Sequence, residues 1–195
     1  MNFPRILKKR KGYIDRIKPF MQKSVIKVLT GQRRVGKSFL LYQLIEEILA
    51  EEPDANIIYV NLEDFTFSSQ QTAEDLHSYI ISHSKEKVKN YIFIDEIQDI
   101  PGFEKVIRSL LLNEDNDIYI TGSNAKMLSG ELATYLSGRY IEFKIYSLSY
   151  SEFLEFHGLT ESETSYELYS RYGGLPYLLN LPLEDETVNE YLKSV

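Results

Sequence analysis

One eight-residue sequence constrains this chain most: Gly31-Gln32-Arg33-Arg34-Val35-Gly36-Lys37-Ser38. It fits the pattern G-x-x-x-x-G-K-[ST] at every fixed position. An apolar run at 25–29 precedes it, so we predict a strand and then a tight loop. A helical apolar pattern at 38–50 follows it, and we expect a helix there with Phe39 on its broad buried face. Glycines let a loop turn tightly, so that successive backbone N–H groups converge on an anion. We therefore expect these eight residues, with the adjacent Phe39, to bind a nucleotide.

The two residues that end this loop have their own predicted roles. Lys37 can reach the β- and γ-phosphates as a point charge, and Ser38 can offer a hydroxyl group to Mg²⁺. The positive end of the helix dipole adds to the attraction for phosphate. The alternative is a glycine turn between strand and helix that contains Lys-Ser by chance, which the flanking strand and helix make less attractive.

A second motif follows about 57 residues downstream, where an apolar strand at 91–94 is followed directly by Asp95 and Glu96. Acids that emerge at the carboxyl end of a buried strand lie where α/β sites assemble. We expect Asp95 to hold Mg²⁺ through a water of the metal, and Glu96 to deprotonate an attacking water. Taken alone, such a strand end is usually solvated. Together with the glycine loop it predicts hydrolysis of a nucleoside triphosphate.

Three further side chains are candidates for contact with the γ-phosphate or the attacking water. Ser123 and Asn124 follow a predicted strand at 117–120, with Ser123 our first choice. The competing interpretation makes either residue the N-cap of the next helix. Arg139 precedes a predicted strand at 140–145 and would stabilise charge in the transition state, unless it is only a surface cation.

Strands alternate with helices up to about residue 146, which predicts a parallel sheet covered on both faces. Two more elements complete this part, a strand at 56–61 and a helix at 73–83, and a helix is also expected at 103–112. Helical patterns at 149–157, 162–172 and 185–195 follow the last strand. We predict an α/β core at 1–146 and a smaller helical portion at 147–195.

Composition and charge exclude several classes of protein. The 195 residues include no cysteine, which rules out a disulfide scaffold and thiol catalysis. No apolar stretch approaches the ~20 residues that span a bilayer, so we expect a soluble, cytoplasmic protein without membrane contact. The net charge of −7 is uneven, because residues 1–38 are strongly basic with Asp15 as their only acid. The cluster at 8–11 could contact DNA, although a short basic tail is more often solvated.

In combination, these motifs resemble the AAA+ superfamily of P-loop ATPases, and more narrowly its prokaryotic members with a C-terminal domain of unknown function. The resemblance rests on the glycine loop, the strand end at 94–98 (Ile-Asp-Glu-Ile-Gln), the segment at 120–126, and residues 136–139 followed by 148–153. It implies a five-stranded parallel sheet in the order 5-1-4-3-2 with a small helical lid, ATP or ADP with Mg²⁺ as ligands, and association of several copies. Members usually continue into a winged-helix segment and the C-terminal domain, which implies that this chain is a fragment.

The resemblance also suggests a role for Pro176, in the sequence Gly173-Gly174-Leu175-Pro176. In related signal-transducing ATPases such a proline approaches the adenine; the alternative is a Gly-Gly-x-Pro turn between two lid helices. The leading function is Mg²⁺-dependent ATP hydrolysis coupled to a conformational change. A nucleotide-gated switch with little turnover is the main alternative. A small-molecule kinase is less favoured, because Glu96 beside Asp95 points to water as the acceptor.

Overall fold

The computed structural model describes residues 8–67, 69, 72–123 and 136–194. Its centre is a parallel sheet of five strands in the order β2-β3-β4-β1-β5, which is the predicted order read from the other edge. The strands are β1 (Ile26–Thr30), β2 (Asn56–Asn61), β3 (Asn90–Asp95), β4 (Asn116–Gly122) and β5 (Tyr140–Lys144). Because all of them are parallel, their carboxyl ends share one edge of the sheet.

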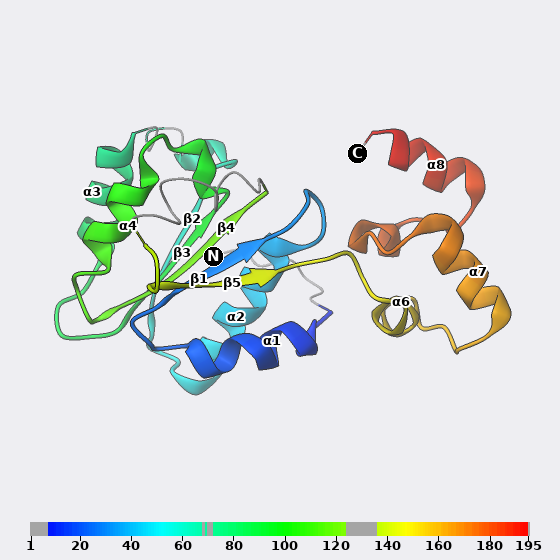
Figure 1. The fold of residues 1–195 in the computed structure, drawn as a ribbon, viewed down its shortest axis with the longest axis horizontal. Coiled ribbons are helices and arrows are strands. Elements are labelled where there is room, and N and C mark those ends of the chain that lie inside the picture. The colour runs from blue at the N-terminus through cyan, green and yellow to red at the C-terminus, as the bar shows by residue number, and fades with distance from the viewer. Residues whose placement is uncertain (1–7, 68, 70–71, 124–135, 195) are drawn as a thin grey trace. The chain divides into compact units, whose positions relative to one another are not determined.

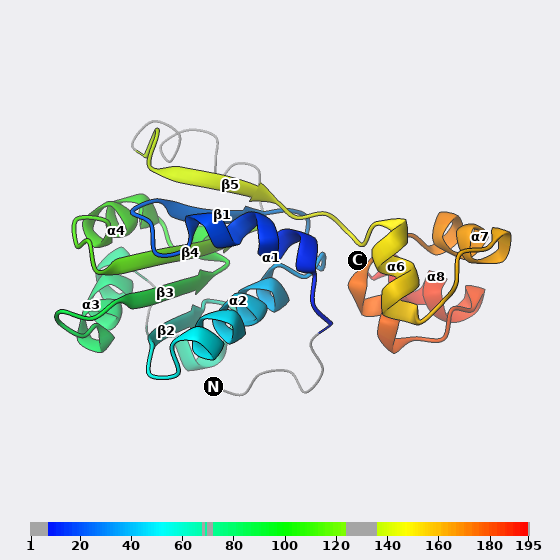
Figure 2. The same ribbon diagram turned by 90° about the horizontal axis from the view of Figure 1, so that it is seen from below.

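Helices cover both faces of this sheet (Figures 1 and 2). One face carries α1 (Lys11–Ile17) and α2 (Lys37–Glu51), and the other carries α3 (Ala73–His83) and α4 (Phe103–Leu110). Short 3-10 turns lie at η1 (Lys18–Phe20), η2 (Phe65–Phe67) and η3 (Ile97–Asp99). β3 and β4 are buried along their whole length, as expected for central strands of a two-sided parallel sheet. Isoleucines from these strands pack with Leu76 of α3 and Val106 of α4.

The sequence-based bounds differ from the observed ones by a few residues at the ends, but one assignment of a face was wrong. We expected Phe39 on the buried side of α2, whereas its exposed fraction is 48%. At 100° per residue, Phe39 lies opposite the stripe formed by Leu40, Leu44 and Ile48, which are the residues buried against the sheet. Its ring instead meets Tyr42 edge-on, with the ring centroids 6.2 Å apart.

A buried ion pair joins two neighbouring strands. Lys27 of β1 and Asp117 of β4 are fully buried, and the ammonium donates to the carboxylate. Asp117 also accepts from the Tyr119 hydroxyl at 2.8 Å and from the backbone N–H of Gln22 at 2.8 Å. Burial lowers the pKa of Lys27 despite the attraction of Asp117. The pair costs desolvation, so its partners must remain together.

The chain divides into two compact units, one comprising Met1–Gly31 with Lys37–Lys144 and the other Gln32–Gly36 with Ile145–Val195. The second unit contains α6 (Tyr150–His157), α7 (Glu163–Tyr172), η5 (Pro176–Asn180) and α8 (Asp185–Lys193). Ser149 and Glu152 form a reciprocal capping box at the start of α6. Phe153, Phe156 and Leu148 form one of its small cores.

A glycine is required between α7 and η5. A Cβ atom on Gly174 would lie 2.2 Å from the carbonyl oxygen of Leu148, a distance that no real side chain tolerates. The close approach lets the backbone N–H of Leu148 donate to the carbonyl of Gly174 at 2.6 Å. Gly173, with φ of +74°, ends α7. The sequence Gly-Gly-Leu-Pro therefore has a structural reason that is independent of any ligand.

Across the described ranges, none of the helices combines the length and the hydrophobicity that a bilayer crossing requires.

Candidate functional site

The glycine loop leaves β1 at the carboxyl edge of the sheet and enters α2. Gly31, Arg34 and Gly36 have φ values of +154°, +66° and +93°, so the loop turns through conformations that favour glycine. Arg34 accepts such a conformation although it carries a side chain. Gln32, Arg33 and Arg34 are exposed, whereas Val35 is buried and anchors the loop.

Lys37 is buried at the first position of α2. Its Nζ atom donates to the carbonyl oxygen of Gly31 at 3.1 Å and lies 3.3 Å from Oε1 of Glu96. The side chains of Lys37 and Glu96 are only 3% and 9% exposed. The two residues that sequence reasoning gave opposite tasks, phosphate binding and proton removal, are thus in contact.

Asp95 ends β3 and is almost completely buried. It is hydrogen-bonded to Ser38, and it accepts from the hydroxyl groups of Thr121 and Tyr59, the latter at 3.2 Å. Burial raises the pKa of Asp95 above its ordinary value, and these hydrogen bonds offset only part of that rise. The predicted Mg²⁺ pair, Ser38 and Asp95, is therefore brought together by the fold.

Glu96 occupies a left-handed backbone conformation, with φ of +55° and ψ of +47°. Its N–H donates to Oγ1 of Thr121 at 2.9 Å, and its carboxylate accepts from Gln98 at 2.6 Å and is hydrogen-bonded to Ser123. Burial alone would raise the pKa of Glu96, but the Gln98 and Ser123 hydrogen bonds and the charge of Lys37 outweigh it and lower this pKa. Glu96 is therefore held as a carboxylate.

Of the two candidates after β4, Ser123 lies at Glu96, and Asn124 lies outside the described residues. The structure adds three residues that the sequence did not single out for this site: Tyr59, Gln98 and Thr121. Register could have suggested two of them. Tyr59 lies on β2 beside β3, and Thr121 is near the carboxyl end of β4. Gln98 carried no such signal.

Arg139 does not join this cluster. Tyr140, the next residue, pairs with Ile26 at the start of β1, whereas the glycine loop follows the other end of that strand. With about 3.3 Å of rise per residue, the length of β1 separates the two ends. A tight turn presents Arg139: its N–H donates to Leu136 O at 2.9 Å, and Gly138 has φ of +74°.

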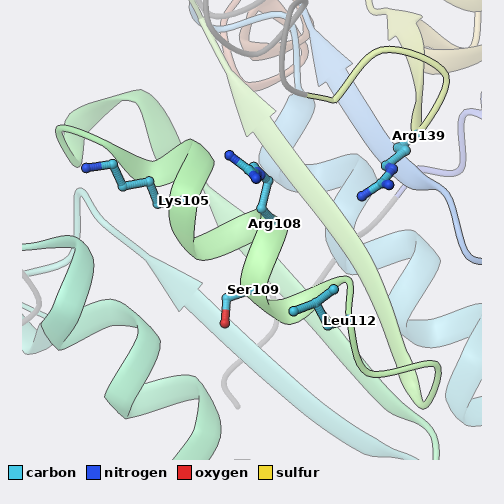
Figure 3. Close-up of a pocket in the computed structure, with 5 residues that line it drawn as sticks. All are labelled: Lys105, Arg108, Ser109, Leu112 and Arg139. Carbon is cyan, nitrogen blue, oxygen red and sulfur yellow. The ribbon is translucent and has the colours of Figure 1, made fainter.

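Arg139 instead borders a basic pocket of about 260 Å³ (Figure 3). Lys105, Arg108, Ser109 and Leu112, from α4 and the turn after it, line the rest of this pocket. Figure 3 shows the guanidinium group of Arg139 directed toward α4. Arg139 is exposed, so its guanidinium group is accessible to a binding partner at this edge of the sheet.

Pro176 and the tip of the glycine loop are neighbours within the second compact unit. The Cγ atom of Pro176 lies 3.7 Å from the position that a Cβ on Gly36 would take. In the same unit, the guanidinium group of Arg34 lies 5.5 Å from the centre of the Tyr191 ring. Both contacts involve residues of the loop that we expect to surround a nucleotide.

A parallel 2-3-4-1-5 sheet, with a glycine loop after β1 and paired acids after β3, defines a P-loop ATPase fold of the AAA+ class. The chain belongs to the AAA-domain family, whose sequence profile matches residues 23–154. It is 40% identical to an uncharacterized protein of Haemophilus influenzae over 95% of this chain and 47% of that protein. It is 31% identical to one of Methanocaldococcus jannaschii, over 87% of this chain and 40% of that protein.

The chain thus spans about half the length, or less, of these two curated relatives. Among solved structures, Cdc6p from Pyrobaculum aerophilum has a similar fold, with a TM-score of 0.59 at 12% identity. That likeness covers 89% of this chain and 57% of Cdc6p. At this identity the likeness concerns the fold alone. The family and the fold agree with the resemblance drawn from the motifs, whereas a C-terminal domain of unknown function is not shown.

Proposed function

We propose that this protein binds ATP and hydrolyses it, with Mg²⁺, to ADP and phosphate, and that turnover is coupled to a conformational change. The observation that carries the proposal is the convergence of Lys37, Asp95 and Glu96 at one edge of the sheet. Lys37 ends the loop after β1, whereas the two acids follow each other at the end of β3, and the three residues have different predicted tasks. A glycine turn with a purely structural role would not explain why they lie together.

The loop at 31–38 supplies the binding half of the reaction. Its backbone N–H groups and the N-terminus of α2 form an environment that favours an anion. Lys37 is held beside Gly31 and needs only to release Glu96 to meet the terminal phosphates. The exposed Gln32, Arg33 and Arg34, the buried Val35, and Phe39 remain proposed contacts of the nucleotide, as does Pro176.

The oxygens of Ser38 and Asp95 fit Mg²⁺. Magnesium in nucleotide sites is bound by one or two protein groups with phosphate oxygens and waters, rather than by a cage of carboxylates. Among the described residues, no group of three or more Asp, Glu, His or Cys side chains is placed to hold a metal ion. A cation beside Asp95 would favour its ionised form against the burial that raises its pKa. When bound, the metal would neutralise phosphate charge.

Glu96 supplies the proposed base. A water oxygen attacks the γ-phosphorus, the bond from that phosphorus to the β,γ-bridging oxygen breaks, and the water proton passes to Glu96. Ser123, hydrogen-bonded to Glu96, is within reach of the same water, and Asn124 remains a candidate with it. Arg139 would stabilise the charge that develops on the γ-phosphate, and since it lies at the other end of the sheet we assign it to the nucleotide of a second copy.

A nucleotide-gated switch with little turnover is the second candidate, and a specific observation favours it. Glu96 accepts hydrogen bonds from Gln98 and Ser123 and lies beside Lys37, and these groups lower its pKa, which makes it a weaker base. Slow proton transfer would leave the nucleotide bound and unhydrolysed. Contact with DNA through residues 8–11 is less favoured, since Lys9 pairs with Glu47 at 2.7 Å and Arg10 is buried.

One set of measurements separates these functions. The purified protein is denatured and the released nucleotide is identified, and phosphate release is then followed with ATP in Mg²⁺, in excess chelator, and with and without DNA. Mg²⁺-dependent phosphate release supports the ATPase. Bound ADP with negligible release supports the switch. Absence of both nucleotide binding and phosphate release overturns both candidates.

A further inference from the structure

Gln98 lies two residues after the proposed base and folds back onto it. The left-handed backbone of Glu96 starts the short turn η3, which is closed by a hydrogen bond from the N–H of Asp99 to the carbonyl of Glu96 at 3.1 Å. A residue two positions after such a bend can reach the side chain that precedes it. The geometry of η3 therefore brings the side chain of Gln98 to that of Glu96.

The carboxamide of Gln98 has a defined orientation. Its Nε2 atom donates to Oε2 of Glu96 at 2.6 Å and makes a longer contact of 3.4 Å with Oδ1 of Asp99. Ionised carboxylates accept hydrogen bonds and donate none, so the nitrogen must face them. The amide oxygen is consequently turned away from both acids.

That oxygen is buried and accepts no hydrogen bond from any residue that the structure describes. Most buried acceptors have a partner, because an unmade hydrogen bond is costly. Water is the smallest donor that would satisfy it. The nitrogen of the same amide group donates to Glu96, so a water bound to the amide oxygen would lie close to that carboxylate.

We propose that Gln98 positions the attacking water: its amide nitrogen orients Glu96, and its amide oxygen accepts one hydrogen of the water that Glu96 deprotonates. A water molecule has two hydrogens. If one is donated to Glu96 and the other to the amide oxygen of Gln98, the lone pair that attacks the phosphorus points in a defined direction. One hydrogen leaves as the proton on Glu96, and the other stays on the oxygen that becomes part of inorganic phosphate. This inference rests on the proposed ATPase function.

Kinetics of two Gln98 variants test the inference. Gln98→Ala removes both interactions, and Gln98→Glu keeps acceptor oxygens but loses the donor to Glu96. We expect either change to lower kcat by about tenfold or more, the scale of loss that misplaced reacting groups cause. The dissociation constants for ATP and ADP should stay within about twofold, since Gln98 has no part in phosphate binding. Glu114→Ala, at an exposed position in the loop after α4, is the control and should keep the wild-type kcat.

An unchanged kcat in Gln98→Ala, with an active wild type, overturns the inference and leaves the ATPase assignment intact. An inactive wild type overturns both. A loss of nucleotide affinity that accounts for the whole loss of activity shows that Gln98 serves binding, and it also overturns the inference.

A second measurement does not depend on turnover. The melting temperatures of Gln98→Ala, Glu96→Ala and the double variant form a cycle that isolates their interaction. We expect the Gln98 substitution to lower the melting temperature less when Glu96 is already absent. Additive shifts would mean that the two side chains do not interact, and would overturn the orienting role of Gln98. If Gln98→Ala does not fold, the cycle is repeated with Gln98→Glu.

Discussion

Nζ of Lys37 lies 3.3 Å from Oε1 of Glu96, and both side chains are at least nine-tenths buried. In the proposed ATPase, a nucleotide that takes this lysine as a phosphate partner would compete with Glu96 for it. We therefore expect nucleotide binding to weaken this ion pair. Because the charge of Lys37 lowers the pKa of Glu96, its loss would make Glu96 a stronger base.

We predict that Lys37→Ala weakens ATP binding by about 10- to 100-fold, because hydrogen bonds to charged groups contribute about 1.5–3 kcal/mol. Calorimetric titration with ATP measures the effect. Lys85→Ala removes an exposed lysine from the loop after α3 and should bind as the wild type does. Equal affinities for the wild type and the Lys37 variant would contradict the binding role of this loop.

Glu96→Gln should bind ATP and stop hydrolysis. The amide keeps the shape of the side chain but cannot accept the proton, and loss of a general base lowers rates by about 10²–10⁴-fold. Phosphate release at saturating ATP is the measurement, with nucleotide affinity determined on the same sample. The exposed Glu114→Gln controls for the change of charge. Release at the wild-type rate would place the base elsewhere.

Asp95→Asn should change the response to magnesium. An amide is a weaker ligand than a carboxylate, so the concentration of Mg²⁺ that gives half-maximal hydrolysis should rise by about tenfold or more, in line with the cost of altering a metal's ligand environment. A titration of phosphate release with MgCl₂ measures this concentration. An unaltered midpoint would remove Asp95 from the metal site.

For Arg139→Ala we expect lower turnover with almost unchanged ADP affinity, because ADP lacks the phosphate that the arginine would contact. Arg16→Ala, which removes an exposed arginine of α1, is the control. Mixing Arg139→Ala with Glu96→Gln decides the geometry: recovered hydrolysis means that the arginine of one copy serves the nucleotide of another. Normal hydrolysis by Arg139→Ala alone would make it a surface cation.

The buried pair Lys27–Asp117 yields a prediction about stability rather than activity. Asp117→Asn leaves a buried ammonium without its counter-charge and should lower the free energy of unfolding by about 3–5 kcal/mol. Urea denaturation followed by circular dichroism gives the value. Asp185→Asn breaks the exposed pair with Arg171 and should cost about 1 kcal/mol or less. Similar losses for the two variants would argue against the special status of the buried pair.

Much of this fold could be predicted because its signals are local. β-branched and aromatic runs marked the strands, and the glycine loop and the acids after β3 fixed which ends of β1 and β3 share an edge. Strand order came from the resemblance, and the sheet confirms it. Phe39 was placed on the wrong face because several apolar residues start this helix, and the sequence does not show which of them face the sheet. The buried stripe of Leu40, Leu44 and Ile48 decides that question in the structure.

The partners of the site residues were less accessible. Gln98 reaches Glu96 only because Glu96 adopts a left-handed conformation, which is uncommon for a residue with a side chain and has no marker in the sequence. Tyr59 contacts Asp95 through strand register, which depends on how β2 and β3 align. The separation of Arg139 from the loop, in contrast, could have been inferred: in the predicted parallel sheet, a residue directly before β5 lies at the edge opposite the glycine loop.

Because every strand runs the same way, the first compact unit has two different ends: Lys37 with the acids Asp95 and Glu96 lies at one, and Arg139 with its basic pocket lies at the other. If copies join tail to head, the contact is heterologous and each copy contributes two different surfaces. In an open row, one nucleotide site always lacks an arginine from a neighbouring copy. In a closed ring, every nucleotide site has one. The rate of hydrolysis per copy would therefore rise with protein concentration and level off once the copies form closed rings.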